Sequence, residues 1–153
     1  MDLVLWRHAE AEDWVPGCND GQRALTPRGV KQAARIGAWL DRQLPDGARV
    51  LVSPALRTEQ TALALGRKYK VKPELASDGT AEQLLAVSQW PDGKGTVLIV
   101  GHQPVLGQVI AQLLCLNSSD CAVKKGAVWW LRNRERESQA QTVVVTVQTP
   151  EVV

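Results

Sequence analysis

The sequence predicts an α/β fold in which a mostly parallel, mixed sheet is covered by helices on both faces. Short apolar runs alternate along the chain with segments of helical periodicity, which is the order of a layered α/β protein. The apolar runs are unbroken, as in strands that are buried on both faces. The chain has 153 residues, of which 44% are hydrophobic and 22% charged. These proportions are typical of a folded chain, and the length predicts a single domain spanning residues 1–153.

The strands are expected where apolar runs stop at polar or turn residues. Four of them are expected in the first two thirds of the chain, at residues 3–6, 50–52, 71–75 (a short edge strand) and 96–100. Two more, at 126–131 and 142–147, are expected to be antiparallel and joined by the charged segment 132–140. This pair makes the predicted sheet mixed rather than wholly parallel.

Four helices are expected between these strands. The first begins with Thr26 as N-cap and Pro27 in the first turn, and continues to about residue 44. The others are expected at 55–69, at 80–89 with Thr80 and Gln83 forming a capping box, and at 104–116. The residues at helical spacing that should face the core are Val30, Ala33, Ala34, Gly37 and Leu40 in the first helix, and Leu56, Ala62, Leu63 and Leu65 in the second.

Composition excludes several functions. The net charge of +2 is too small to predict nucleic-acid or membrane binding from the electrostatic field alone. No apolar run approaches the ~20 residues of a membrane helix, and no signal peptide is present, so a cytoplasmic protein is expected. The three cysteines form no CxxC pair, which predicts free thiols rather than a zinc site or a disulfide framework.

Polar residues that can carry chemistry follow three of the predicted strands. The first strand ends at Arg7 and His8, the second is followed by Ser53 and then by Arg57, and the strand at 96–100 leads to His102. Ligands of open α/β sheets bind beyond the carboxyl ends of the strands. If these strands are parallel neighbours, two arginines and both histidines of the chain converge there.

The residue types in this cluster match a phosphoryl group. Two guanidiniums, always charged and forked, fit a tetrahedral dianion, and helix N-termini beginning at Pro54 and Pro104 would add backbone N–H donors. No carboxylate cluster with metal spacing accompanies the histidines, so a metal-free site is favoured. One neutral histidine can then attack phosphorus while the other donates hydrogen bonds to its oxygens. Ser53 either caps the following helix or bonds a group of the site.

Four motifs, in this order, resemble the histidine phosphatase (phosphoglycerate mutase-like) superfamily. They are LWRH at 5–8, LTPRG at 25–29, SPALRTEQTA at 53–62 and VGHQP at 100–104. Order and spacing match to about residue 116, whereas the last forty residues carry little of the resemblance. The short chain and the forms of the last two motifs are most similar to the SixA branch, which comprises protein phosphohistidine phosphatases.

The resemblance implies a phosphoglycerate mutase-like fold and a role for each matching residue. His8 matches the nucleophile that becomes transiently phosphorylated, and Arg7, Arg57 and His102 match the groups that bind the phosphoryl oxygens. No cofactor and no metal are implied. The implied partner is a phosphorylated protein of the histidine-containing phosphotransfer type, or a small phosphorylated molecule, with neither nucleic acid nor membrane involved.

Two positions depart from the family pattern. The residue after the nucleophile, usually glycine, is Ala9 here. The superfamily's general acid has no clear match, and Asp78, Glu10 and Glu59 are the candidates. Absence of this acid fits a phosphoramidate substrate, because an imidazole leaves more readily than an alkoxide, which needs a delivered proton.

Three functions remain open from the sequence. The first is a phosphatase for phosphohistidine on a protein, favoured because short connections leave little chain for a lid and an open site suits a protein substrate. The second is the same chemistry on a small phosphomonoester or phosphoanhydride. The third, a protein that recognises phosphate without turnover, is disfavoured by the complete set of two histidines and two arginines, and a mutase is disfavoured by the missing acid.

Overall fold

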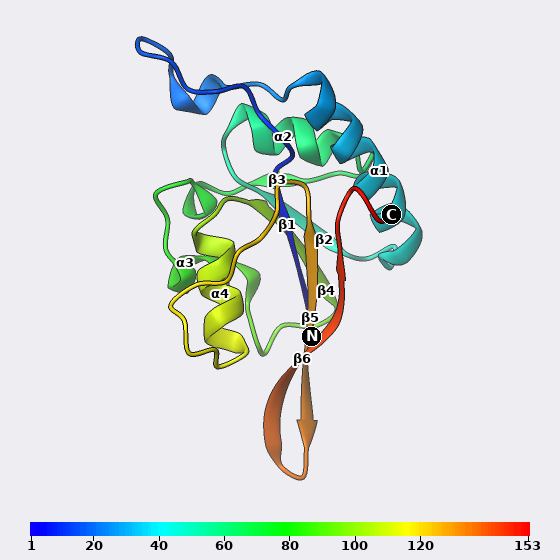
Figure 1. The fold of residues 1–153 in the computed structure, drawn as a ribbon. Helices are drawn as coiled ribbons and strands as arrows, with labels where there is room; N and C mark the ends of the chain where they lie inside the picture. The colour runs from blue at the N-terminus through cyan, green and yellow to red at the C-terminus, as the bar shows by residue number, and fades with distance from the viewer.

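The computed structural model describes residues 1–153 and contains one six-stranded sheet. The strand order is β3-β2-β4-β1-β5-β6, in which the first four strands are parallel and the last two antiparallel (Figure 1). The strands span Asp2–Arg7 (β1), Arg49–Val52 (β2), Lys70–Val71 (β3), Thr96–Gly101 (β4), Val128–Arg136 (β5) and Gln139–Gln148 (β6). The predicted mixed, mostly parallel α/β sheet is therefore confirmed.

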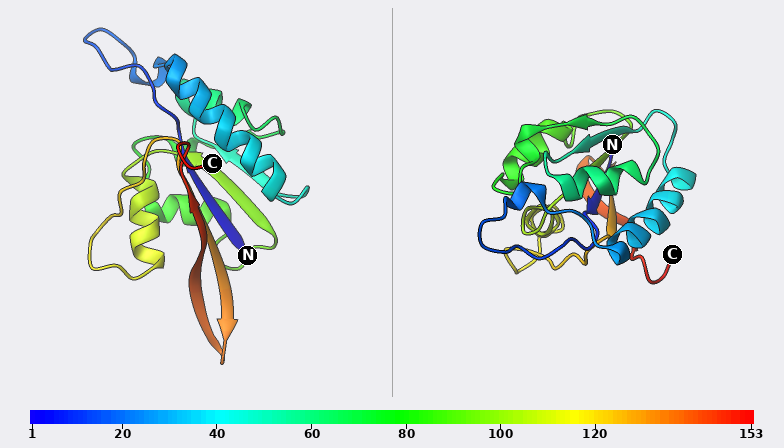
Figure 2. Two further views of the ribbon diagram at one scale, coloured as in Figure 1. Left: turned by 45° about the vertical axis from the view of Figure 1, so that its right-hand side comes forward. Right: turned by 90° about the horizontal axis from the view of Figure 1, so that it is seen from above.

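Four α-helices cover the two faces of this sheet. They span Pro27–Gln43 (α1), Leu56–Leu63 (α2), Ala81–Ser88 (α3) and Val105–Leu113 (α4), and two short 3₁₀ turns, η1 and η2, lie at Asp20–Gln22 and Pro73–Leu75. Helices α1 and α2 lie on one side of the sheet and α3 and α4 on the other (Figure 2). Alternate residues of β1 enter two separate cores, with Leu3 and Leu5 facing α3 and α4 and Val4 and Trp6 facing α1 and α2. This explains why the β1 sequence is apolar without interruption.

Helix α1 buries Ala33, Gly37 and Leu40 as predicted, and it also buries Ile36. The prediction was wrong for Val30, which is 55% exposed, and for Ala34, which is also exposed. The first turn of α1 packs on the loop after β1 rather than on the sheet, since a Cβ at Gly29 would lie 1.9 Å from the Glu10 carbonyl oxygen. The glycine of the LTPRG motif is thus required by close backbone packing.

Helices α2 and α4 are shorter than predicted. Helix α2 ends at Leu63, which is 64% exposed, and the chain turns at Gly66 with a φ of +77°. A glycine adopts this conformation without steric cost, so the helix stops before the predicted residue 69. Helix α4 ends at Leu113, and Cys115 has a φ of 54°. The N-terminal boundaries are closer to the prediction, because Thr26 and Thr80 cap α1 and α3 as expected.

Both edges of the sheet differ from the prediction. Strand β3 is Lys70–Val71, so only Val71 of the expected strand at 71–75 lies in the strand that pairs with β2. Pro73, which lacks a donor, begins η2 instead. The charged segment 132–140 is not an irregular connection, because it forms the end of β5 and the first two residues of β6, joined by a tight turn at Glu137 and Ser138. Both turn residues have positive φ, as a two-residue hairpin requires, and the hairpin projects from the body (Figure 1).

No helix in the structure combines the length and the apolar character needed to cross a lipid bilayer.

Candidate oxyanion site

The register of three parallel strands brings the predicted residues together. Arg7 pairs with Gly101 and Val52 with Val100, so β1, β4 and β2 end at one edge. The pairing continues one residue further, where the His8 N–H donates to the Gly101 carbonyl at 3.1 Å. The rings of His8 and His102 lie side by side, with centroids 5.5 Å apart. The strands are therefore parallel neighbours, as the convergence of these side chains requires.

His8 is held in one tautomer by the backbone. Its Nδ1 lies 2.7 Å from the Ala9 carbonyl oxygen, and because a carbonyl can only accept, Nδ1 must carry the proton. Burial lowers the pKa of His8 to about 3, and the neighbouring His102, Arg57 and Arg7 act in the same direction against the Ala9 bond. The ring is therefore neutral at neutral pH, and its Nε2 carries the free lone pair that a nucleophile needs.

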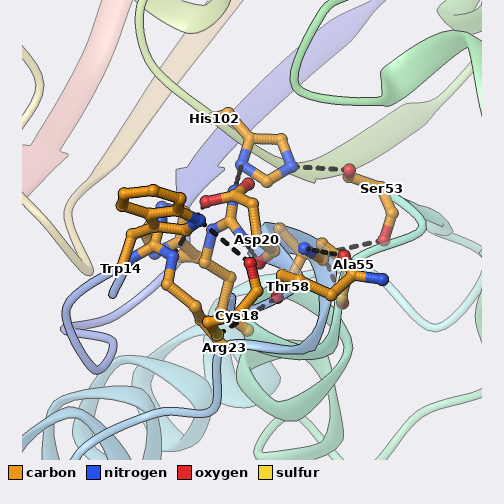
Figure 3. Close-up of polar contacts among 12 residues, drawn as sticks. Trp14, Cys18, Asp20, Arg23, Ser53, Ala55, Thr58 and His102 are labelled. Atoms are coloured by element: carbon orange, nitrogen blue, oxygen red, sulfur yellow. Dashed lines mark hydrogen bonds and ion pairs between the residues drawn. The ribbon is translucent and has the colours of Figure 1, made fainter. Parts of the chain in front are cut away.

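His102 has the opposite tautomer. Its Nδ1 lies 3.4 Å from Nη2 of Arg57, a group that only donates, so Nδ1 accepts and Nε2 carries the proton. Nε2 donates to the Ser53 Oγ over 2.6 Å (Figure 3). Burial and the charge of Arg57 lower the pKa of His102 to about 4. Ser53 is therefore a partner of the histidine, and it does not cap α2, whose N-cap residue is Ala55 with no side-chain cap.

The two arginines present unused donors at this edge. Arg57 is buried and donates from Nη1 to the Asp20 carbonyl at 2.9 Å, while Arg7 donates from Nη1 to the Val123 carbonyl at 2.7 Å. The Nε atom of each guanidinium is buried and has no hydrogen-bond partner. Buried donors of a charged group are costly to leave unpaired. An oxyanion in contact with both guanidiniums is the group that their chemistry fits.

Asp20 joins the cluster although the sequence did not point to it. Its carboxylate lies 3.2 Å from Nη2 of Arg57 and 2.9 Å from Nε of Arg23. Slight burial acts to raise its pKa, but the hydrogen bond from Arg23 and the charges of Arg57 and Arg23 outweigh it and hold the pKa below the ordinary value. No sequence signal links Asp20 to Arg57, because the irregular loop after β1 brings them together.

The three carboxylates considered as the general acid have other roles or positions. The Glu10 carboxylate accepts from Thr26 Oγ1 at 2.7 Å, and Glu59 accepts from the Tyr69 hydroxyl at 3.1 Å. Asp78 is exposed. None of the three forms a hydrogen bond or ion pair with His8 or His102. The carboxylate that does reach the cluster, Asp20, stays ionised and is therefore poorly suited to donate a proton.

Two further residues organise the loop after His8. The Thr61 hydroxyl donates to the Arg57 carbonyl at 2.7 Å and accepts from the Ala9 N–H at 3.1 Å. It thereby anchors the backbone of Ala9, the residue whose carbonyl fixes the His8 tautomer. The Ala9 methyl group is buried among Ala11, Leu25 and Ala33, so the alanine fills a small apolar cluster.

The chain contains no group of three or more His, Cys, Asp or Glu side chains that could hold a metal ion. The chemistry available at this edge is that of two neutral imidazoles and two guanidiniums. These groups and the fold define an α/β protein in which the side chains at the carboxyl ends of the strands have the chemistry that fits an oxyanion.

Comparison with known proteins identifies the family to which this chain belongs. The model of the histidine phosphatase superfamily (branch 1) matches residues 3–79, and the chain belongs to this family. It is 33% identical over 121 residues to the phosphohistidine phosphatase SixA of Escherichia coli, covering 74% of each chain.

Solved structures give the same result for the fold. The structure of a protein histidine phosphatase SixA complexed with tungstate superposes with a TM-score of 0.79 at 26% identity, covering 98% of this chain and 97% of the other. A phosphoserine phosphatase from Entamoeba histolytica superposes with a TM-score of 0.72, covering 99% of this chain and 98% of the other. At 16% identity, this second likeness concerns the fold alone.

Proposed function

We propose that this protein is a phosphatase that hydrolyses phosphohistidine on a protein of the histidine-containing phosphotransfer type. The observation that carries the proposal is the neutral His8 ring, with a free Nε2, in a cluster with two guanidiniums whose buried Nε atoms have no hydrogen-bond partner. The relationship to SixA over three quarters of the chain supports the phosphohistidine substrate. Tungstate, which the SixA structure holds, is a tetrahedral oxyanion like phosphate and supports an oxyanion as the ligand.

In the proposed reaction, Nε2 of His8 attacks phosphorus in line with the substrate P–N bond. The Nε2–P bond forms as the P–N bond breaks, and the substrate imidazole leaves with its electron pair and takes a proton from water. Arg7 and Arg57 stabilise the charge on the three equatorial oxygens. His102, whose one N–H donates to Ser53, contributes through Nδ1, which accepts from Arg57 and holds that guanidinium in place. Water then attacks the phosphorylated His8, which releases inorganic phosphate and restores the free ring.

The absence of a carboxylic acid beside the histidines supports a phosphoramidate substrate. An imidazole leaving group needs less assistance than an alkoxide, which must receive a proton as the P–O bond breaks. A phosphatase for a small phosphomonoester would have to obtain that proton from another source, because Asp20 is ionised and paired with Arg57. Comparable turnover of alkyl phosphates and phosphohistidine would favour the small-substrate function instead.

The test is a substrate panel combined with trapping of the phosphoenzyme. A phosphorylated histidine-phosphotransfer domain, free phosphohistidine and an alkyl phosphate are incubated with the wild-type protein, and label from ³²P is followed under conditions that preserve phosphohistidine. The chain has only two histidines, so the position of the label is decided by two variants. His8→Ala should lose both label and turnover, whereas His102→Ala should still be labelled, with a rate lower by about 10²–10³.

Two results would contradict the proposal. Wild-type turnover in His8→Ala would exclude the covalent step. Binding of phosphate without turnover of any substrate in the panel would indicate a recognition protein rather than an enzyme.

A further inference from the structure

The loop between β1 and α1 forms an arm that projects from the body of the protein. The arm comprises residues 12–24 and is drawn in dark blue in Figure 2. Its base is closed by pairing of Ala11 with Leu25 and by a 2.8 Å bond from the Glu12 N–H to the Ala24 carbonyl. Arg23 donates across the arm to the Glu12 carbonyl at 2.7 Å. These bonds give the arm a defined shape.

The arm is also attached to the oxyanion site. Arg57 binds both the carbonyl and the carboxylate of Asp20, at 2.9 and 3.2 Å. Arg23, which bonds across the arm to Glu12, binds the same carboxylate. Asp20 therefore links the bonds that close the arm to the bonds that attach it to the site. The position of the arm relative to the phosphoryl-binding groups is therefore fixed by an ion pair with a buried guanidinium.

The far end of the arm carries two large apolar side chains without apolar cover. Trp14 and Val15 are each 55% exposed, and Pro16 and Gly17 follow them. The Trp14 indole N–H donates to the Cys18 carbonyl at 3.0 Å, which holds the ring on the arm while leaving much of its surface open (Figure 3). A single exposed apolar residue is ordinary, but a tryptophan held in place on an arm that is bonded to Arg57 is the kind of anchor that protein interfaces use.

The depth of the histidines indicates which molecule would cover this surface. His8 is 7% exposed and His102 is 4% exposed, so a phosphohistidine carried by another protein must bring its surface close to the rim of the site. The arm is bonded to Arg57 of the site through Asp20, so it would meet the approaching surface. A free phosphorylated amino acid has no protein surface to bring against Trp14 and Val15.

We propose that Trp14 and Val15 form a docking surface for the apolar surface around the phosphohistidine of a folded protein substrate. This inference rests on the proposed function, because it assigns the arm to recognition of that function's substrate. Docking lowers the KM for the protein substrate and leaves the chemical step to the groups at the strand ends. The arm residues are therefore specificity determinants rather than catalytic residues.

The test compares two substrates in variants of the arm. Val15→Ser and the double variant Trp14→Ser/Val15→Ser are assayed with a phosphorylated histidine-phosphotransfer domain and with free phosphohistidine. Val145→Ser is the matched control, since Val145 is 42% exposed on β6, at the opposite edge of the sheet from β3. Truncation of an interface anchor predicts that kcat/KM of the double variant for the phosphoprotein falls at least about tenfold, mainly through KM. Its kcat/KM for free phosphohistidine should equal that of the wild type.

The outcomes separate this inference from the proposed function. If the wild type hydrolyses neither substrate, the proposed function itself fails. If the wild type hydrolyses both and the arm variants match it on the phosphoprotein, the docking surface is excluded. An equal loss on both substrates would also overturn docking, because it would show that the changes act on the site through Asp20. Val15→Ser, which removes no side-chain hydrogen bond, guards against a loss caused by misfolding of the arm.

Discussion

The Asp20 carboxylate lies 3.2 Å from Nη2 of Arg57, so an internal anion already occupies part of the guanidinium that is proposed to bind a phosphoryl group. The Asp20 side chain is about half exposed, at 49%, whereas that of Arg57 is buried. The carboxylate can therefore leave more easily than the arginine can move. An incoming dianion must either displace Asp20 or share Arg57 with it, and the two negative charges repel each other in both cases.

Asp20→Asn should consequently strengthen the binding of a tetrahedral oxyanion. Removal of a partly exposed charge predicts a modest gain, about two- to fivefold in the inhibition constant of tungstate or phosphate. Competitive inhibition assays measure it, and Asp41→Asn is the control, since Asp41 forms a comparable ion pair with Arg67 at 2.8 Å on the surface. Weaker inhibition in Asp20→Asn would mean that the carboxylate positions Arg57 rather than competing with the ligand.

The two histidines should display opposite tautomers in solution. The Ala9 carbonyl requires a proton on Nδ1 of His8, and Arg57 and Ser53 place the proton of His102 on Nε2. Because the chain has two histidines, ¹⁵N NMR of a histidine-labelled sample gives one pattern for each ring. At pH 7 both rings should be neutral, one with a protonated Nδ1 and the other with a protonated Nε2.

Ser53→Ala extends this test to a positioning role. Loss of the 2.6 Å partner should alter the ¹⁵N shifts of His102 and leave those of His8 unchanged. A lost buried hydrogen bond of about 1 kcal/mol predicts a fall of roughly fivefold in kcat. Ser53→Thr keeps the hydroxyl and should restore both the shifts and the rate. Unchanged His102 shifts in Ser53→Ala would contradict the assigned tautomer.

Thr61→Val should lower kcat through the loop after His8. Thr61 is fully buried, and its hydroxyl links the Arg57 carbonyl to the Ala9 N–H. Without it the Ala9 N–H loses its acceptor, and the Ala9 carbonyl that fixes the His8 tautomer is less well oriented. We expect a fall of about tenfold in kcat with KM nearly unchanged, as about 1–2 kcal/mol of lost hydrogen bonding allows.

The matched variant is Thr61→Ser, which retains the hydroxyl and should keep most of the activity. If Thr61→Ser is as impaired as Thr61→Val, the buried methyl group and not the hydrogen-bond chain is responsible. A rise in KM without a change in kcat would point to Arg57 rather than to His8.

Local patterns were sufficient for most of the fold and for the composition of the site. The unbroken apolar runs predicted the buried parallel strands. Arg7, His8, Arg57 and His102 could be grouped because each lies at, or shortly after, the carboxyl end of one of three parallel strands. The prediction was less accurate for the second helix and for the β5–β6 pair. The helix ends before Gly66, a residue type that commonly ends helices but lies inside the predicted range, and Glu137 and Ser138 adopt positive φ although neither residue type indicates it.

Asp20 shows a second limit of sequence reasoning. Its contact with Arg57 spans 37 residues and depends on the path of an irregular loop. Two of the candidate general acids, Glu10 and Glu59, do not contact the histidines. Their carboxylates accept hydrogen bonds from the hydroxyls of Thr26 and Tyr69, and strand and helix periodicity does not predict these contacts. The hydrogen-bond partners of loop residues depend on tertiary packing, whereas the pairing of the strands sets the positions of residues at strand ends.

The lowered pKa values of both histidines predict that the protein loses stability as the pH falls. In the folded chain the pKa of His8 is about 3 and that of His102 about 4, below the ordinary value of 6.5. The unfolded chain therefore binds more protons than the folded chain below about pH 6.5, and each histidine lowers the free energy of unfolding by up to about 1.4 kcal/mol per pH unit until its folded form is protonated.

Between pH 6.5 and 5 most carboxylates have not yet been protonated, so the histidines should dominate this slope. Urea unfolding in phosphate-free buffers measures it, and His8→Asn and His102→Asn should each remove about half of the pH dependence. A free energy of unfolding that stays constant over this interval would mean that the two rings are accessible to protons in the folded protein, and that His8 is not kept neutral by its burial.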